Sequence, residues 1–241
     1  MDWYYIVLIV LGGIIVWVFL SALLYKQFFK RFYDVVLSLL ALIILSPLLL
    51  IVSIIARIKL GKGIIFKQRR IGKNNKEFNL LKFRSMTEER DENGVYLPDE
   101  DRMTKFGNFL RKTSIDELPS LINIIKGDMS IIGPRPLPVR YLSRYTEEQK
   151  KRHNVRPGLS NPAVNKGRNN LSWEEQFKGD VEYVENISLW VDLKSLINTA
   201  KIVLTREGAT SEDGGCRGEF IGTADINDLI DDDKNYMKIK K

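Results

Sequence analysis

The chain opens with two long apolar stretches and then changes to a mixed polar pattern. Residues 3–25 contain no charged side chain, and a helix of this length, at about 1.5 Å per residue, can cross the roughly 30 Å hydrocarbon core of a bilayer. Lys26, Lys30 and Arg31 follow directly. Because positive residues favour the cytoplasmic side, the pattern predicts a transmembrane helix with its N-terminus outside. A secretory signal peptide is the competing interpretation, but residue 2 is acidic and no good small-residue cleavage site follows.

The second apolar stretch, residues 35–56, is also long enough to span a membrane but carries Ser46 and Pro47 at its middle. Proline removes a backbone donor and clashes with the preceding turn, so the helix should bend or break there. Residues 57–84 hold ten Lys or Arg and one Glu, and a second crossing would place this block outside. We therefore expect a re-entrant helix-break-helix, with the Ser46 hydroxyl as a candidate to satisfy the freed backbone. An ordinary spanning helix kinked at Pro47 is the alternative.

Beyond the apolar stretches, short runs of apolar and polar residues predict two strands. These strands cover residues 64–68 and 78–86, and a turn at 73–76 joins them. Lys82 and Arg84 are two residues apart in the second strand and so share a face. A cation pair of this kind suits a phosphate group, although a solvated sheet edge carries the same pattern.

Helical spacing of apolar residues returns at 114–126, and a glycine at 127 ends the segment. Asp116 and Glu117 therefore lie at the start of a helix. Ser114 and Glu117 also match a capping box, in which acidic residues satisfy free N–H groups and oppose the helix dipole. From this fragment alone, helix capping is the favoured interpretation and catalysis is the alternative.

Two later helical segments carry one notable polar residue each. Residues 145–154 are charged, and we expect their lone His153 to be solvated or packed rather than catalytic. Residues 189–205 are amphipathic, and Asp192 lies close to the apolar face, where an isolated acid would need a partner. From residue 208 onward the chain is Gly-rich, then acidic, then basic, which predicts a weakly ordered tail.

Charge and composition restrict the partners without identifying one. The 241 residues hold 37 Lys plus Arg against 30 Asp plus Glu, a formal net charge of +7 that favours phosphorylated ligands, anionic lipids or nucleic acid. Residues 87–104 concentrate acids, Gly and Pro without periodicity, which predicts a mobile solvated loop rather than a metal site. Cys216 is the single cysteine, which rules out an intramolecular disulfide, and we interpret it as an ordinary loop residue.

Three arginines are anchored beside glycine or proline. They are Arg135 in Gly-Pro-Arg-Pro, Arg156 in Arg-Pro-Gly and Arg168 in Gly-Arg-Asn. A carboxylate pair together with loop-held guanidinium groups is the set that metal-assisted phosphoryl transfer requires. The acids hold Mg²⁺ or attack phosphorus, and the guanidinium forks neutralise the oxygens.

Taken together, these motifs resemble the bacterial sugar transferase family. Its members are small monotopic phosphoglycosyl transferases that start glycan assembly on polyprenol phosphate. The resemblance covers residues 30–192 in the family's order and rests on Lys30-Arg31-Phe32-Tyr33-Asp34, Ser46-Pro47, Lys82-Phe83-Arg84-Ser85-Met86, Arg111-Lys112-Thr113-Ser114-Ile115-Asp116-Glu117-Leu118-Pro119 and Gly127-Asp128-Met129-Ser130-Ile131-Ile132-Gly133-Pro134-Arg135-Pro136. The N-terminal apolar stretch precedes the minimal family core.

The resemblance implies transfer of a sugar 1-phosphate from a UDP-sugar to polyprenol (undecaprenyl) phosphate, with release of UMP, by a covalent two-step route that uses Mg²⁺. Asp116 would be the nucleophile, and Asp116 and Glu117 would hold the metal. The phosphate and substrate would be bound by Lys82, Arg84, Arg111, Arg135, Arg168 and Asp192. The product would start a capsule, exopolysaccharide or glycoprotein glycan, with downstream glycosyltransferases as further partners.

The predicted fold class is α+β, mainly helical. Residues 1–28 would form a transmembrane helix and short linker, 29–60 a re-entrant membrane hairpin, 61–207 a compact cytoplasmic catalytic domain and 208–241 the tail. The family's membrane helix is a kinked hairpin in one leaflet, so the resemblance also favours the re-entrant arrangement. The protein would then lie in the inner membrane, in contact with membrane lipid, with its catalytic domain on the cytoplasmic face.

Two other functions fit parts of the pattern. A membrane-tethered basic module could bind anionic lipid or nucleic acid, with a steep salt dependence and no need for Asp116. Nucleic acid is disfavoured as a partner, because no recognisable module interleaves aromatic residues with the cations. A membrane-bound diphosphatase would cleave UDP-sugars by water attack and use the same acids only as metal ligands.

Overall fold

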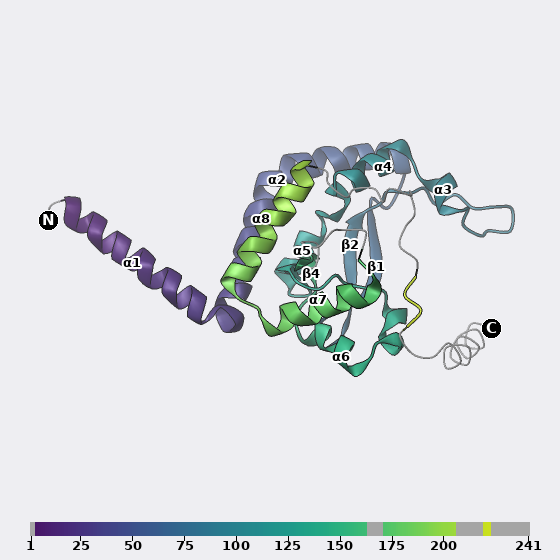
Figure 1. Ribbon diagram of the computed structural model, residues 1–241. Helices are drawn as coiled ribbons and strands as arrows, with labels where there is room; N and C mark the ends of the chain where they lie inside the picture. Colours follow the sequence, from purple (N-terminus) through teal and green to yellow (C-terminus); the bar gives the residue numbers. More distant parts are fainter. Residues whose placement is uncertain (1–2, 163–170, 206–218, 223–241) are drawn as a thin grey trace.

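The computed structural model describes residues 3–162, 171–205 and 219–222. The chain is mostly helical and contains two small sheets (Figure 1). In chain order the elements are α1 (Trp3–Leu23), the π-helical turn η1 (Tyr25–Phe29), α2 (Lys30–Leu60), β1 (Ile65–Ile71), η2 (Lys73–Asn75), β2 (Glu77–Phe83), α3 (Asp99–Arg102), α4 (Lys105–Lys112), η3 (Ile115–Glu117), α5 (Ser120–Lys126), β3 (Ser130–Ile132), η4 (Val139–Arg144), α6 (Glu147–Lys150), η5 (Lys151–Asn154), β4 (Gly158–Ser160), α7 (Trp173–Glu185) and α8 (Leu189–Thr205).

The two apolar N-terminal helices are compatible with membrane association. Helix α1 and the helical segment Tyr25–Leu60 are each long and apolar enough to cross a bilayer. Nearly all side chains of α1 are exposed, and so are half of those in the second segment. Helix α1 extends away from the remaining elements (Figure 1). Its C-terminal part is attached to α2 through Tyr33, whose hydroxyl lies 3.1 Å from Trp17 Nε1 and 3.0 Å from Ser21 Oγ.

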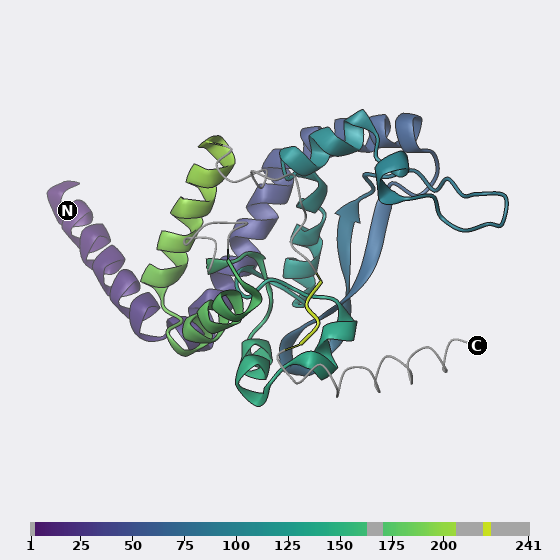
Figure 2. The same ribbon diagram turned by 45° about the vertical axis from the view of Figure 1, so that its right-hand side comes forward.

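Helix α2 is bent but not broken. The prediction of a helix-break-helix is corrected in this respect, because α2 runs without interruption from Lys30 to Leu60 with Pro47 inside it. Both ribbon views show it turning sharply partway along its length (Figure 2). Pro47 cannot donate to the carbonyl of Ile43 four residues earlier, and the Ser46 hydroxyl donates to that oxygen instead, at 2.8 Å. The predicted role of Ser46 is therefore confirmed.

Polar residues along one side of α2 attach it to the rest of the chain. Arg31 donates to the carbonyls of Ile124 and Ile125, at 2.6 and 2.9 Å, and so occupies the C-terminal end of α5. Asp34 is buried and accepts hydrogen bonds from Ser130 Oγ at 2.7 Å and from the Ile131 N–H at 2.9 Å. These bonds fix α2 against α5 and β3.

The predicted pair of strands exists, with shifted boundaries. Strands β1 and β2 pair antiparallel from Ile65↔Phe83 to Ile71↔Glu77 around η2. The first strand is longer than predicted, and the second ends at Phe83, before Arg84. The second sheet is a short parallel pair, β3 and β4. Directly after β3, Gly133 lies close to the backbone of Arg156 and Gly158. A Cβ on Gly133 would lie only 2.6 Å from the Arg156 carbonyl oxygen, so only glycine fits there.

The predicted acidic loop at 87–104 contains local structure. The chain forms an isolated bridge between Arg90 and Tyr96, and a second bridge between Met86 and Met103 encloses both the first bridge and the single turn α3. The Arg90 guanidinium lies 3.9 Å from the centre of the Tyr96 ring. The segment projects from the body as an extended arm (Figure 1).

An aromatic core packs beneath α6 and α7. It contains Tyr141, Tyr145, Phe177 and Phe220, and His153 packs on it through the edge of the Tyr145 ring. The packed interpretation of His153 is confirmed. The helical predictions at 145–154 and 189–205 correspond to α6 with η5 and to α8.

The predicted weakly ordered tail includes one well-packed segment. Phe220 is 2% exposed, and its N–H donates to the Tyr141 hydroxyl at 3.2 Å. Glu219 accepts from Arg140 at 2.6 Å and from Arg144 at 3.0 Å. The prediction was wrong for residues 219–222, because one aromatic ring and one acid suffice to attach the segment to the core. The rest of the tail, including Cys216, lies outside the described residues.

Candidate active site

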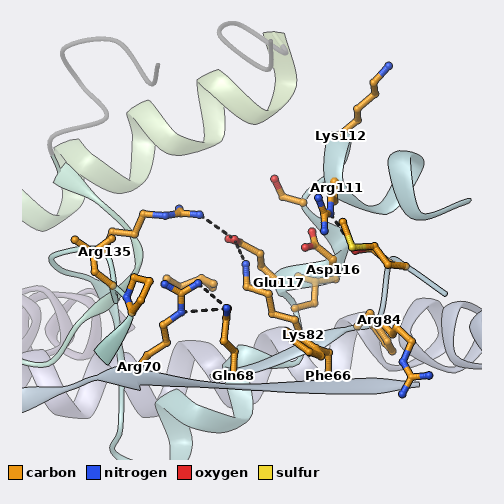
Figure 3. Close-up of a pocket in the computed structure, with 18 of the residues that line it drawn as sticks. Phe66, Gln68, Arg70, Lys82, Arg84, Arg111, Lys112, Asp116, Glu117 and Arg135 are labelled. Carbon is orange, nitrogen blue, oxygen red and sulfur yellow. Dashed lines mark hydrogen bonds and ion pairs between the residues drawn. The ribbon is translucent and has the colours of Figure 1, made fainter. Parts of the chain in front are cut away.

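A cavity of about 1370 Å³ lies over one face of the β1–β2 sheet. Its lining comes from both strands, from α4 and η3, from the turn that carries Arg135, and from α7 and α8. Figure 3 shows cationic side chains from several of these elements gathered around Asp116 and Glu117. Six of the predicted site residues line this cavity: Lys82, Arg84, Arg111, Asp116, Glu117 and Arg135.

Side chains of α5 attach it to the free edge of β2. Ser120 Oγ donates to the Leu81 carbonyl at 2.8 Å, and the Leu81 N–H donates to Asn123 Oδ1 at 3.0 Å. Asn123 Nδ2 also donates to the Asn79 carbonyl at 2.9 Å. Because η3 directly precedes α5, these bonds place Asp116 and Glu117 beside Lys82.

The backbone before α5 does not form the predicted capping box. Ser114 has a left-handed conformation (φ 57°) and makes no capping hydrogen bond. Asp116 and Glu117 lie in the short 3₁₀ turn η3, and the residue that caps α5 is Pro119, which has no side-chain acceptor. The predicted capping box of Ser114 and Glu117 is therefore wrong. The Glu117 carboxylate instead pairs with Lys82 and Arg135.

Asp116 is a buried carboxyl group among charges of both signs. It is 8% exposed. Burial raises the pKa of the Asp116 carboxyl above its usual value, and the negative charge of Glu117 adds to the increase, whereas Lys82 and Arg111 oppose it. A poorly hydrated carboxylate is a stronger base than an exposed one, whereas the neighbouring cations favour its ionised form.

Glu117 is the more fully compensated acid of the pair. Its Oε1 lies 2.7 Å from Lys82 Nζ and 3.5 Å from a terminal nitrogen of Arg135 (Figure 3). Arg111 is oriented by Ser85, because its Nε donates to Ser85 Oγ at 3.0 Å. The cations thus surround the acid pair from β2, from α4 and from the Arg135 turn.

Arg135 is positioned by the end of strand β1. The Ile71 N–H donates to the Leu137 carbonyl at 3.1 Å, and Arg70 forms a bridge with Pro138. The chain that follows Arg135 therefore runs along the sheet, and the Arg135 side chain reaches over it toward Glu117 (Figure 3).

The other predicted site residues lie differently. Arg84 lines the cavity, but its guanidinium binds the Glu88 carboxylate at 2.8 Å and the Lys62 carbonyl at 2.9 Å and points away from the acid pair (Figure 3). The strand ends before Arg84, so strand alternation with Lys82 does not determine the direction of the Arg84 side chain. Arg168 lies outside the described residues.

Asp192 is not part of the described lining of the cavity. It is buried beneath α8 and accepts hydrogen bonds from Tyr25 at 2.6 Å, Lys30 at 2.6 Å and Tyr183 at 2.7 Å. The expectation that this acid needs a partner is confirmed, and its partners connect α8 to the membrane-associated helix α2. In this position Asp192 attaches α8 to η1, α2 and α7.

Two residues of the cavity were missed from the sequence. Gln68 and Arg70 line it together with Phe66, at alternate positions of β1. The predicted strand stopped at residue 68, so Arg70 was not predicted to lie on the same face of the strand. Strand alternation extended by two residues would have found it.

Comparison with known proteins identifies this arrangement. The sequence model of the bacterial sugar transferases matches residues 25–206, which is most of the chain. The chain belongs to the bacterial sugar transferase family. The matched region begins after α1 and includes every cavity residue described above.

Several curated relatives support the assignment. The chain is 46% identical over 198 residues to an uncharacterized sugar transferase, EpsL, of Bacillus subtilis, covering 82% of this chain and 98% of the relative. It is 36% identical over 201 residues to the undecaprenyl-phosphate galactose phosphotransferase of Salmonella typhimurium, covering 76% and 42%. It is also 36% identical over 190 residues to a UDP-N-acetylgalactosamine-undecaprenyl-phosphate N-acetylgalactosaminephosphotransferase of Aeromonas hydrophila, covering 76% and 45%. The chain thus spans less than half the length of these last two proteins.

The acid pair of this sugar transferase suits a magnesium ion only in part. Asp116 and Glu117 supply the oxygen ligands that Mg²⁺ prefers, and Mg²⁺ is usually held by one or two carboxylates together with substrate phosphates. Within the described ranges, no group of three or more His, Cys, Asp or Glu could hold a metal. The two carboxylates would therefore fit only an ion that takes its remaining ligands from water or from a bound ligand.

Proposed function

We propose that this protein transfers a sugar 1-phosphate from a UDP-sugar to polyprenol phosphate, giving a polyprenol-diphosphate-sugar and UMP. The relatives of known activity carry names of undecaprenyl-phosphate sugar phosphotransferases. The observation that carries the proposal is the buried Asp116, which shares a cavity of about 1370 Å³ with Glu117, Lys82, Arg111 and Arg135. A diphosphate is the ligand whose charge such a set of cations can neutralise.

In the proposed first step, a carboxylate oxygen of Asp116 attacks the phosphorus that bears the sugar. The new O–P bond replaces the bond to the bridging oxygen, which leaves with its electron pair as part of UMP. The product is an acyl phosphate on Asp116 that carries the sugar. Lys82, Arg111 and Arg135 support this step because they reduce the repulsion between the carboxylate and the diphosphate.

In the second step, an oxygen of polyprenol phosphate attacks the same phosphorus. The bond from phosphorus to Asp116 breaks, and the carboxylate leaves in its ionised form. The product is the polyprenol-diphosphate-sugar. Mg²⁺, held by Asp116 and Glu117 with the substrate phosphates, would supply further charge neutralisation when bound.

The raised pKa of Asp116 has a direct consequence for this chemistry. Attack requires the ionised carboxylate, and burial favours the protonated form. The neighbouring cations Lys82 and Arg111 keep the ionised form accessible. Binding of a diphosphate would add negative charge, so the cations must compensate both the substrate and the nucleophile.

The proposed membrane arrangement brings a lipid substrate to this site. Helix α2 would enter one leaflet and return, with α1 as an additional anchor and the catalytic domain on the cytoplasmic face of the inner membrane. The bend of α2, the cations after it and the Ser46 bond to the Ile43 carbonyl support this arrangement. To test it, cysteines introduced after Phe29 and after Leu60 are treated with an impermeant thiol reagent on intact cells. Both positions should resist labelling, and labelling of the second alone would refute the hairpin.

The activity is tested by incubating the detergent-solubilised protein with a panel of UDP-sugars, Mg²⁺ and polyprenol phosphate while UMP is measured. We expect UMP release that requires the lipid phosphate for turnover. Release of UMP together with free sugar 1-phosphate would indicate a diphosphatase. Binding of anionic vesicles with no UMP from any donor would indicate a binding module instead.

A further inference from the structure

Arg70 lies in the same cavity as the acid pair, and no carboxylate of the described residues pairs with it. Its Nε and one terminal nitrogen donate to Gln68 Oε1, at 3.2 and 2.6 Å, so the guanidinium is held in one orientation (Figure 3). In the parts of the chain that the structure describes, no acid lies within ion-pair distance of it. Its neighbours include two further cations, Arg135 and Arg140.

This clustering of positive charge is unfavourable without a ligand. Burial, together with the charges of Arg135 and Arg140, lowers the pKa of Arg70 to about 10, whereas Glu117 opposes the shift. The protein thus places a partly buried guanidinium next to like charges and orients it with a neutral amide. An anion that binds between Arg70 and Arg135 would relieve this repulsion and use the planar fork of donors.

The strand register shows how Arg70 is placed relative to the acid pair. Lys82, which binds Glu117, is paired with Phe66, and Arg70 is four residues further along β1. At about 3.3 Å per residue this separation is roughly 13 Å along the sheet. Long side chains reduce that distance, since Arg135 reaches across the cavity to within 3.5 Å of Glu117. The cavity therefore holds a second cationic group, Arg70 with Arg135, beside the acid pair.

We propose that Arg70, oriented by Gln68 and assisted by Arg135, binds the nucleotide-side phosphate of the UDP-sugar, the one that leaves as UMP. This inference rests on the proposed function and assigns the two linked phosphates of the donor to neighbouring side chains of the cavity. The sugar-linked phosphate lies at Asp116. When the bridging P–O bond breaks, negative charge grows on the UMP phosphate, and the guanidinium of Arg70 stabilises it.

The direction of β1 favours the nucleotide over the lipid phosphate at Arg70. The strand begins at Ile65, shortly after the membrane-associated helix α2 ends at Leu60, and runs away from that end of α2 (Figure 1). Arg70 is near the far end of the strand. A lipid phosphate would approach from the side of α2, whereas a soluble nucleotide can occupy the far end.

The chain contains a matched control for this residue. Arg69 is adjacent on β1, but its side chain is 74% exposed and pairs with Glu77. Arg69→Gln and Arg70→Gln therefore remove the same charge from the same strand, on opposite faces. Thermal unfolding is followed for both, and Arg70→Lys, which keeps the charge but loses the fork, replaces Arg70→Gln if the latter does not fold.

Three quantities are measured in detergent: the inhibition constant of UMP, the KM for the UDP-sugar and the KM for polyprenol phosphate. For Arg70→Gln we expect the first two to rise about tenfold or more, because a charge-assisted hydrogen bond to phosphate is lost, and the third to stay within about twofold. Arg69→Gln should leave all three within about twofold.

Each remaining outcome would overturn the assignment. Unchanged UMP inhibition in Arg70→Gln would show that Arg70 does not contact the leaving nucleotide. A rise confined to the KM for polyprenol phosphate would place the lipid phosphate at Arg70. If the wild-type protein forms no UMP from any donor, the proposed function fails, and direct UMP binding by calorimetry to the wild-type and Arg70→Gln proteins still tests the subsite separately.

Discussion

The ion pair between Arg152 and Asp180 is the most deeply buried charged contact described in this sugar transferase. Their side chains are 1% and 0% exposed, and the shortest distance between them is 2.7 Å. Arg152 also donates to the Arg135 carbonyl at 2.7 Å, and Asn161 donates to Asp180 at 3.1 Å. Asp180→Leu would leave the guanidinium buried without its anion, which destabilises a fold by about 3 to 5 kcal/mol. For a chain of this size, that loss corresponds to a fall in Tm of roughly 6 to 20 °C.

The double variant Arg152→Met/Asp180→Leu separates the ion pair from simple packing. Replacing both charges removes the uncompensated cation, so the double variant should be more stable than Asp180→Leu alone. It should not recover fully, because the hydrogen bond to the Arg135 carbonyl is worth about 1 kcal/mol and is lost. That loss should also loosen the Arg135 turn and raise the KM for the donor.

The assay is thermal unfolding in detergent, followed by near-ultraviolet circular dichroism, with UMP release measured on the same samples. Arg140→Gln is a suitable control, since it removes an exposed partner of Glu219. An Asp180→Leu protein within about 1 kcal/mol of wild type would refute the reasoning. The reasoning would also be refuted if the double variant lost as much unfolding free energy as Arg152→Met and Asp180→Leu lose when added together.

The other predictions concern the site, acid sensitivity and the C-terminal segment. Asp116→Asn should stay folded yet release almost no UMP, and wild-type protein given UDP-sugar without acceptor should gain a phosphosugar on the peptide that contains Asp116, detected by mass spectrometry. Because the pKa of Asp116 is raised, kcat/KM should fall as the pH drops through a value above the ordinary aspartate range of about 4, measured as the acid limb of a pH profile. Burial lowers the pKa of His153 to about 3, so the imidazole stays neutral in the folded state, whereas in the unfolded state it gains a proton below about pH 6.5. The free energy of unfolding should therefore fall as the pH decreases from 6.5 toward 3. His153→Gln should reduce this dependence of the unfolding free energy on pH in denaturant titrations. Phe220→Ala removes a ring that is 2% exposed and should lower the free energy of unfolding by about 3 kcal/mol in the same titrations.

Each of these predictions has a result that contradicts it. Substantial UMP release by folded Asp116→Asn would remove the covalent route. A kcat/KM that is independent of pH down to pH 4 would show that ionisation of the Asp116 carboxyl does not control the reaction. Equal pH slopes for wild type and His153→Gln would assign the acid sensitivity to other groups. A Phe220→Ala protein as stable as wild type would show that the segment at 219–222 contributes nothing to the core.

The sequence predicted the helices better than the contacts between distant elements. The apolar stretches and the amphipathic pattern at 189–205 have a local origin, so periodicity was sufficient. The Ser114–Glu117 capping pattern was misleading, because Ser114 adopts a left-handed conformation that a sequence pattern does not reveal. The acid pair itself was found because two adjacent carboxylates near several arginines are chemically unusual.

Residues whose role depends on tertiary contact could not be placed. The partner needed by Asp192 was expected, but its identity depends on α8 packing against residues more than 160 positions earlier. Arg70 was missed because the predicted strand ended at residue 68, three residues before the end of β1. Phe220 gave no signal, because one buried ring in a polar tail has no periodicity, and its packing surface is formed by α7 and by the chain around Tyr141.

The attachments of α2 have a practical consequence for any soluble version of this enzyme. A fragment that begins at residue 61 would lack Arg31 and Asp34, and the main-chain groups of Ile124 and Ile131 that they bind would lose their partners. Asp192 would lose its ion pair with Lys30 in the same fragment. Buried polar groups without partners destabilise a fold by about 1 to 3 kcal/mol each. Removing α2 would therefore leave several groups of the remaining chain without partners, and purification has to retain the whole helix.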